Sequence, residues 1–132
     1  MVAGLSFTIS TTISTSPEDI YRAWLDSGGH TAMTGGQAVA SDQQQAVFSA
    51  WDGYISGTNI TLEPNRRIVQ SWRTTEFEEH EPSSKLEIIL EPVSNGTKLT
   101  LHHTNLPEHG MQYQQGWRDH YFDPMKAFFE RH

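Results

Sequence analysis

The sequence predicts an α+β fold in which a curved antiparallel β-sheet of about six or seven strands wraps around one long C-terminal helix. Short segments with period-two alternation and many β-branched residues follow one another along most of the chain. From Met111 onwards, the spacing of the large apolar residues changes to a helical one. Because the strands form a run instead of alternating with helices, the sheet is expected to be antiparallel. A single helix need not fill a broad curved sheet, so we expect a cavity between the two.

A strand and a short helix are predicted at the N-terminal end. Residues Ser6–Thr15 alternate and are rich in β-branched side chains, which favours a strand. Ser16 can cap the following helix and Pro17 suits its first position, so the helix is expected to run to about Asp26. The segment Ser27–His30 contains two glycines and is expected to end it.

The stretch before the central hairpin has a weaker pattern. Residues His30–Gly36 are ambiguous, and one turn of helix is among the structures that fit them. Residues Gln37–Ser41 and Gln45–Trp51 are predicted as two strands joined through Asp42–Gln44.

The central element is a β-hairpin formed by Tyr54–Leu62 and Arg66–Arg73. The Glu-Pro-Asn sequence between them stops the first strand, because proline has no N–H for a ladder and asparagine tolerates left-handed backbone. We expect Leu62 and Ile68 to lie near each other across the turn. Two aromatic residues lie toward the open end, Tyr54 and Trp72. One parity of the first strand is expected to share a face: Tyr54, Ser56, Thr58, Ile60 and Leu62.

A second hairpin follows an acidic loop. The loop, Thr74–Ser84, is expected to be solvated, whereas Lys85–Glu91 and Lys98–Thr104 alternate and are predicted as strands. Asn95-Gly96 between them is a strong hairpin turn signal. Six side chains are expected to point inward: Leu86, Ile88, Leu90, Leu99, Leu101 and His103.

The C-terminal helix is predicted from about Met111 to the end of the chain. Its apolar residues recur at intervals of four, four, four and three, which places them on one stripe. Pro124 lies inside this pattern and is expected to bend the helix or loosen a turn. The stripe consists of Tyr113, Trp117, Tyr121, Met125 and Phe128.

Composition argues against several classes of function. The formal net charge is −7 and the nine basic residues are scattered, which argues against nucleic acid and against an anionic membrane surface as partners. The absence of cysteine excludes disulfides and thiolate ligands, and the histidines lack zinc-type spacing, so we expect no metal and no cofactor. No signal peptide or membrane-spanning stretch is visible, so a cytoplasmic location and one domain over residues 1–132 are expected.

Three stretches resemble a known family: WDGYISGTNITLEPNRRIVQSWRTTEF, KLTLHHTNLPE and GWRDHYFDPMKAFF. They are very similar to the Aha1-type (AHSA1) branch of the START-like, Bet v 1-like (SRPBCC) superfamily, and the likeness covers nearly the whole chain. The resemblance implies a helix-grip fold, with a curved antiparallel sheet gripping a long C-terminal helix and two short helices near the start. The eukaryotic namesake is a co-chaperone that stimulates the ATPase of Hsp90 and carries an additional N-terminal domain, which we do not expect within these 132 residues. Other members of the superfamily bind apolar ligands or act as cyclases.

Seven residues are the candidate site. Aromatic side chains offer a large apolar face and a polar tip, so they either line a ligand pocket or fill the core between sheet and helix. In the pocket interpretation, three residues form the floor, namely Trp51, Tyr54 and Trp72. Three form the wall, namely Tyr113, Trp117 and Tyr121. His103 supplies a polar contact, or else is a buried histidine bonded to a neighbour.

Three hypotheses follow from this site. The first is a non-enzymatic module that binds a small hydrophobic or aromatic molecule. The second is a protein-interaction module of co-chaperone type with an Hsp90-type partner. The third is a cyclase- or hydrolase-like enzyme, which would require two polar groups converging in the cavity; no residue is assigned a catalytic role. A monomer or weak dimer is expected.

Overall fold

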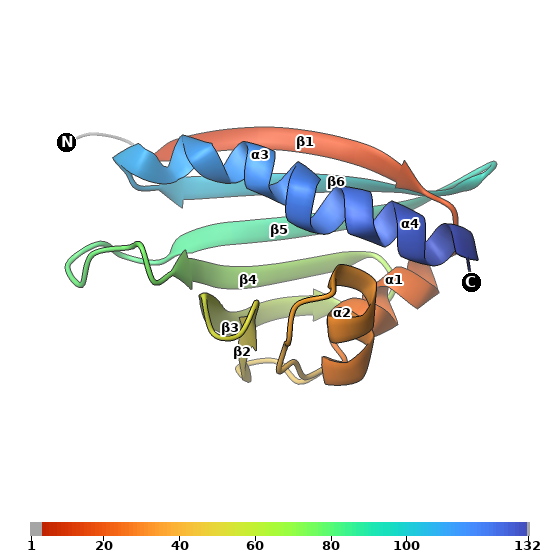
Figure 1. Ribbon diagram of the computed structural model, residues 1–132, viewed down its shortest axis with the longest axis horizontal. Helices are drawn as coiled ribbons and strands as arrows, with labels where there is room; N and C mark the ends of the chain where they lie inside the picture. Colours follow the sequence, from red (N-terminus) through yellow and green to blue (C-terminus); the bar gives the residue numbers. More distant parts are fainter. Residues whose placement is uncertain (1–3, 132) are drawn as a thin grey trace.

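The computed structural model of the protein describes residues 4–131 and contains one six-stranded antiparallel sheet with the order β1-β6-β5-β4-β3-β2 (Figure 1). The C-terminal helical segment crosses one face of this sheet, which confirms the predicted α+β helix-grip class. The strands are β1 (Leu5–Ile13), β2 (Val47–Ala50), β3 (Ile55–Glu63), β4 (Arg67–Thr74), β5 (Ser84–Val93) and β6 (Gly96–Leu106). Two short helices follow β1, namely α1 (Pro17–Trp24) and α2 (Ser27–Thr34).

The C-terminal segment consists of four helical pieces in succession: η1 (Glu108–Gln112), α3 (Tyr113–Trp117), η2 (Arg118–Phe122) and α4 (Asp123–Arg131). η2 is a π-helical turn, in which the N–H of Asp123 donates to the carbonyl of Arg118. Pro124 has no N–H to donate to the carbonyl of His120, four residues earlier, so the regular α-helical ladder is interrupted here. The prediction that Pro124 loosens a turn is confirmed.

The wider turn changes which phenylalanine enters the core. Phe129 is 9% exposed and belongs to the core, whereas Phe128 is only half-buried against it. The predicted stripe was therefore wrong at its last member, because it assumed a regular α-helical period throughout. A π-helical turn holds more residues than an α-helical one, so a constant step of four keeps Met125 and Phe129 in line with Tyr121.

The helix α2 begins at Ser27, earlier than the sequence predicted. The segment Ser27–His30 starts α2 instead of only ending α1, because the carboxylate of Asp26 accepts from the N–H of Gly29 at 2.7 Å and caps the new helix. Glycine is required at position 29, since a Cβ there would lie 2.9 Å from the Cα of Ala23. The side chain of Ser16 caps α1 as expected.

Of the two strands predicted before the hairpin, the first does not form and the second is shorter than predicted. Residues Gln37–Ser41 form no strand, because only Val39 pairs, with Ser49, in an isolated bridge. The backbone beyond Val39 bonds elsewhere: the N–H of Ala40 donates to the hydroxyl of Ser27 at 2.9 Å. The second prediction, Gln45–Trp51, shortens to β2, since both of its ends have left-handed backbone, with φ of 72° and 52°.

The central hairpin has the predicted register at its turn and a bulge further along. Leu62 pairs with Ile68 as expected, but the register shifts between Asn59 and Thr61, so Ile60 is the extra residue of a bulge. A bulge reverses the alternation, and Ile60 is 43% exposed while Asn59 is fully buried. The expectation of one shared face was therefore wrong. Tyr54 lies just before β3 instead of within it.

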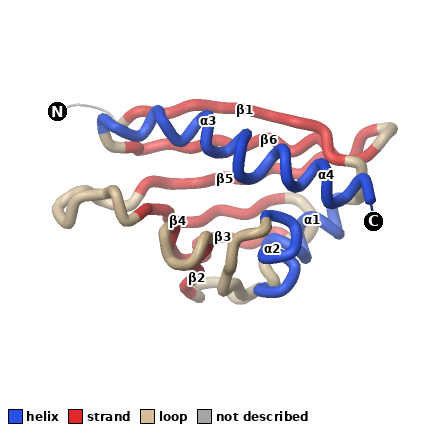
Figure 2. The backbone as a smooth tube through the Cα atoms, viewed as in Figure 1, coloured by secondary structure: helices blue, strands red, loops and turns tan. Residues whose placement is uncertain are grey.

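The second hairpin agrees with the prediction. β5 and β6 pair through the turn at Asn95-Gly96, and all six expected side chains, including His103, are buried on the face toward the helix. The acidic loop at residues 75–83 projects beyond the ends of β4 and β5 (Figure 2). Within residues 4–131, no helix combines the length and apolar character needed to cross a bilayer.

Candidate functional site

A pocket of about 430 Å³ lies between the sheet and the C-terminal helical segment. It brings together six of the seven predicted site residues, and His103 is not among those that line it. The lining residues are Trp51, Tyr54, Ile55, Trp72, Gln112, Tyr113, Gly116, Trp117, His120 and Tyr121.

The inner wall of the pocket is a contiguous group of aromatic rings. Tyr113, Trp117 and Tyr121 follow one another at four-residue steps along α3 and η2, and Trp72 faces them from β4. The ring centroids of Trp72 lie 4.9 Å from Tyr113 and 5.6 Å from Trp117, and those of Trp117 and Tyr121 are 4.7 Å apart. All four rings are almost completely buried, so mutual packing fixes this wall.

Trp51 sits at the mouth of the pocket on a strained turn. Its φ is 52° and that of Asp52 is 57°, a conformation that costs a non-glycine residue about 1–3 kcal/mol. Its ring lies against Gly36, where a Cβ would come within 2.3 Å of the indole, and it contacts His120 at a centroid distance of 5.4 Å. The indole N–H of Trp51 is buried and has no hydrogen-bond partner among the residues that the structure describes.

His103 lies behind the wall, and neighbouring groups occupy both of its ring nitrogens. The indole N–H of Trp117 donates to Nδ1 at 3.0 Å, and because an indole can only donate, the proton of a neutral His103 resides on Nε2. Nε2–H then donates to Ser84 Oγ at 2.7 Å, and that hydroxyl donates to the carbonyl of Trp72 at 2.9 Å. Burial lowers the pKa of His103 to about 3. His103 therefore orients Trp117, and no carboxylate is among its hydrogen-bond partners within residues 4–131.

A second buried histidine, His30, holds the opposite end of the wall. Its Nδ1 faces the carbonyl of Trp24 at 2.9 Å, so Nδ1 carries the proton and Nε2 accepts from the hydroxyl of Tyr121 at 2.8 Å. Burial lowers the pKa of His30 and raises that of Tyr121. His30 was not predicted as a site residue, because it follows two glycines in a segment without a clear period.

Replacing Tyr121 with Phe is expected to lower the free energy of unfolding by about 1–3 kcal/mol, because the acceptor nitrogen of His30 would stay buried without a donor. Urea unfolding would measure the change. Tyr21→Phe is the matched control, since that half-buried hydroxyl has no hydrogen bond within residues 4–131, and its effect is expected to stay within about 0.5 kcal/mol. Equal effects of the two substitutions would contradict the assignment.

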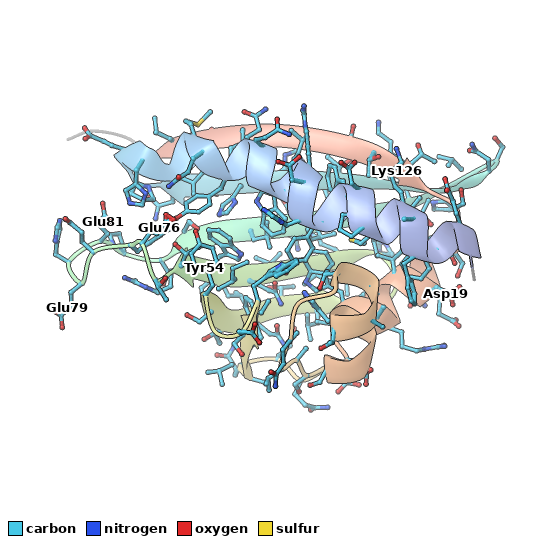
Figure 3. All side chains as sticks on the ribbon, in the orientation of Figure 1. Asp19, Tyr54, Glu76, Glu79, Glu81 and Lys126 are labelled. Carbon is cyan, nitrogen blue, oxygen red and sulfur yellow. The ribbon has the colours of Figure 1, made fainter. Side chains whose placement is uncertain are left out.

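A carboxylate and three hydroxyls meet at the other end of the pocket. The hydroxyl of Tyr54 donates to Glu76 Oε1 at 2.7 Å, and the hydroxyls of Tyr113 and Thr74 are 2.6 Å apart. Figure 3 shows Tyr54 and Glu76 next to each other at the base of the acidic loop. Burial raises the pKa of Tyr54, and the bond to Glu76 raises it further. Glu76 was predicted to lie in a solvated loop, so its contact with Tyr54 at the pocket was not predicted.

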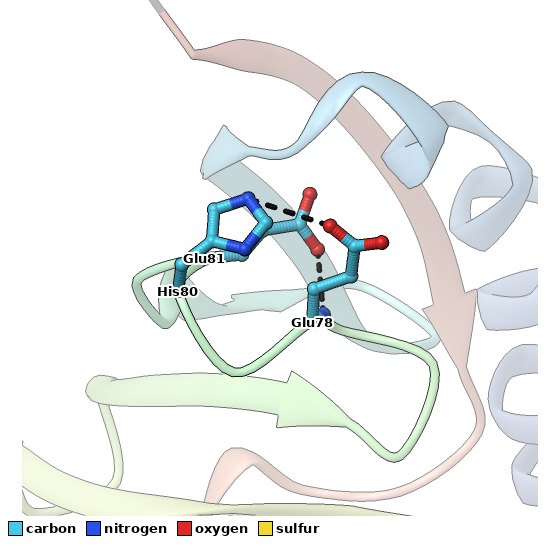
Figure 4. Close-up of side chains that lie close together, drawn as sticks. All are labelled: Glu78, His80 and Glu81. Atoms are coloured by element: carbon cyan, nitrogen blue, oxygen red, sulfur yellow. Dashed lines mark hydrogen bonds and ion pairs between the residues drawn. The ribbon is translucent and has the colours of Figure 1, made fainter.

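Two other groupings lie away from this pocket. Glu78, His80 and Glu81 bring one ligand atom each within 4.8 Å of one another in the exposed acidic loop (Figure 4). Glu81 is already engaged there, because it accepts from the N–H of Glu78 at 2.8 Å and contacts His109 at 3.1 Å. A hollow of about 590 Å³ near α1 is lined mainly by polar and charged residues. Neither grouping has the aromatic enclosure of the first pocket.

Comparisons with known sequences all point to one family. The sequence profile described as Activator of Hsp90 ATPase homolog 1-like protein matches residues 14–130. The Activator of 90 kDa heat shock protein ATPase homolog 1 of Homo sapiens is 30% identical over 125 residues, which cover 92% of this chain and 36% of the human protein. The corresponding activator of Dictyostelium discoideum is 25% identical over 118 residues, covering 86% of this chain and 30% of that protein. The chain thus spans about a third of the length of these relatives.

Solved structures share the fold over almost the whole chain. An HSP90 activator from Plasmodium falciparum superposes with a TM-score of 0.83 at 24% identity, covering 94% of this chain and 95% of that one. The Aha1 dimer from Colwellia psychrerythraea superposes with a TM-score of 0.79 at 17% identity, covering 95% and 96%. At these identities, the two likenesses bear on the fold alone.

Proposed function

The chain belongs to the family of Activator of Hsp90 ATPase homolog 1-like proteins, and from this premise we propose that it binds a small hydrophobic or aromatic molecule in the pocket beneath α3 and η2. The observation that carries the proposal is the pocket itself, about 430 Å³ in volume and enclosed by six aromatic side chains. Pockets for small molecules fall between roughly 300 and 1,000 Å³ and are predominantly apolar with a few placed polar groups. Here Gln112 and the hydroxyls of Tyr54 and Tyr113 are such groups.

Preorganisation of the wall supports binding. Trp117 and Tyr121 are oriented by hydrogen bonds to buried histidines, so they need no further ordering when a ligand enters. Trp51 contributes a strained backbone, and such outliers gather at ligand sites; its buried N–H at the mouth has no hydrogen-bond partner within residues 4–131.

The test uses Gly116, which lines the pocket and faces open space. A Cβ at this position meets nothing within 4 Å, so Gly116→Leu is expected to fill the pocket without a clash. Replacing a helical glycine also favours the helix by up to about 1 kcal/mol, so the variant should fold. A ligand screen by NMR chemical-shift perturbation would identify saturating ligands for the unmodified protein, and we expect Gly116→Leu to abolish their binding.

Gly28→Leu is the control for this variant. It makes the same change in α2, where the nearest atom to a Cβ is the Asp26 carboxylate at 3.4 Å, and it should retain full affinity. Saturating ligands that bind Gly116→Leu as well as the unmodified protein would overturn the proposal, as would a screen with no saturating ligand.

A second candidate is a co-chaperone function directed at an Hsp90-type protein. It is favoured by the human activator, which is 30% identical across 92% of this chain. The test is the ATPase rate of purified Hsp90 with and without this protein, and the expected result is stimulation. Because an exposed surface would carry this function, Gly116→Leu should stimulate as well as the unmodified protein. If the protein neither stimulates the ATPase of Hsp90 nor binds Hsp90, this candidate function is removed.

A further inference from the structure

The pocket is surrounded by aromatic rings set at different tilts. Trp72 and Tyr113 are inclined by 78°, Trp117 and Tyr121 by 54°, and Trp72 and Trp117 by 39°. The lining of the pocket is therefore rich in π-systems, and a π-face attracts a cation within about 6 Å of its centroid.

The charges around the pocket favour the same kind of ligand. None of the lining residues is lysine or arginine, and the one lining base is His120 at the exposed mouth. Glu76 lies one hydrogen bond behind Tyr54, at 2.7 Å, and its charge contributes to raising the pKa of Tyr113. The whole chain carries a formal net charge of −7. An anionic ligand would find no fixed positive partner here, whereas a cation meets both the rings and the carboxylate.

The form of the cation follows from the hydrogen-bonding groups. A primary ammonium needs acceptors for three N–H groups, and the lining offers few: the hydroxyl oxygens of Tyr54 and Tyr113, each already in one hydrogen bond, and the amide oxygen of Gln112. A fully alkylated ammonium needs no acceptor, and aromatic enclosures recognise it through the rings alone.

We infer that the pocket selects a small organic cation, namely a molecule with a quaternary or fully alkylated ammonium group on an apolar or aromatic body. Trp51, Tyr54, Trp72, Tyr113, Trp117 and Tyr121 surround the ligand, and the Glu76 carboxylate supplies the opposite charge. This inference rests on the proposed binding function and specifies the chemical class of its ligand.

The test compares two molecules of the same shape. Benzyltrimethylammonium and neopentylbenzene differ in that a neutral carbon replaces the charged nitrogen. Both would be titrated against the full chain, with tryptophan fluorescence and the NMR signals of the indole N–H groups as readouts. The cation is expected to bind about tenfold more tightly than its neutral counterpart.

Two variants isolate the contribution of the carboxylate. Glu76→Gln keeps an acceptor for Tyr54 but removes the charge. The variant is therefore expected to bind the cation about threefold more weakly and to bind neopentylbenzene with unchanged affinity. Glu79→Gln makes the same change in charge at the outer end of the loop, away from the pocket, and should affect neither ligand (Figure 3).

The outcomes separate this inference from the proposal beneath it. Equal affinities, or tighter binding of neopentylbenzene, would overturn the selection of a cation and leave the proposed function standing. The same holds if other apolar ligands saturate the pocket and benzyltrimethylammonium does not. If no ligand of any class saturates it, the proposed function itself fails. Equal weakening by Glu76→Gln and Glu79→Gln would remove Glu76 from the site.

Discussion

Acidification from about pH 7 to about pH 4 is expected to destabilise the fold, because His103 cannot take up a proton where it lies. Burial lowers the pKa of His103 to about 3, whereas an unfolded chain protonates histidine near pH 6.5. Above about pH 6.5, His103 is neutral in both states and has no effect on the pH dependence. Below it, the unfolded chain binds a proton that the folded protein does not, so the free energy of unfolding falls by about 1.4 kcal/mol per pH unit until about pH 3.

Urea unfolding at a series of pH values would measure this slope. His103→Gln removes the titrating group, so the variant should be less stable at neutral pH. Its free energy of unfolding should fall less steeply in acid, because about one proton fewer is taken up on unfolding. His30 also has a lowered pKa, so part of the slope will remain. His80→Gln serves as the control, since it makes the same substitution at a histidine whose side chain is 78% exposed. Parallel pH profiles for His103→Gln and the unmodified protein would refute the prediction.

Trp117→Ala is expected to lower the free energy of unfolding by about 3–5 kcal/mol, because a buried tryptophan leaves a large cavity. Trp117 contacts the rings of Trp24, Trp72 and Tyr121, and its N–H is the donor that satisfies His103. Its loss therefore removes packing and also leaves a buried acceptor unpaired.

Trp51→Ala is the control for this substitution. Trp51 lines the same pocket but is only partly buried, and its N–H has no partner within residues 4–131, so its removal should cost much less stability. Both variants are expected to lose ligand binding, and chemical denaturation with a ligand titration would separate the two effects. A similar loss of stability in both variants would contradict the view that Trp117 stabilises the fold whereas Trp51 serves mainly in ligand binding.

Periodicity predicted those elements whose geometry is regular. β5 and β6 alternate without interruption and were predicted with the correct inward faces. The bulge at Ile60 was not predicted, because the side chains on either side of it keep an unbroken alternation in the sequence. The start of α2 was not predicted, since it depends on capping by Asp26 and on close contact of Gly29 with Ala23, which periodicity cannot indicate in a glycine-rich segment.

The candidate site was predicted as a set of residues but not in its internal arrangement. The residues were chosen because they are aromatic and lie on the inward face of their elements, and six of the seven line one pocket. The sequence could not indicate that His103 lies behind Trp117, because both share the inward face and only the orientation of the rings separates them. Glu76 and His30 lie in segments without periodicity, where contacts with Tyr54 and Tyr121 arise only from the folded chain.

The strand order has a consequence for how the chain folds during synthesis. Thr8 of β1 pairs with His102 of β6, 94 positions later, so β1 leaves the ribosome long before the strand that pairs with it within the described sheet exists. Closing so long a loop is entropically costly and delays the last strand pairing. The nascent segment LSFTISTTI carries no charge and no proline, which makes it prone to self-association until β6 is made. Self-association of this segment before β6 is made is therefore expected to lower the yield of folded protein.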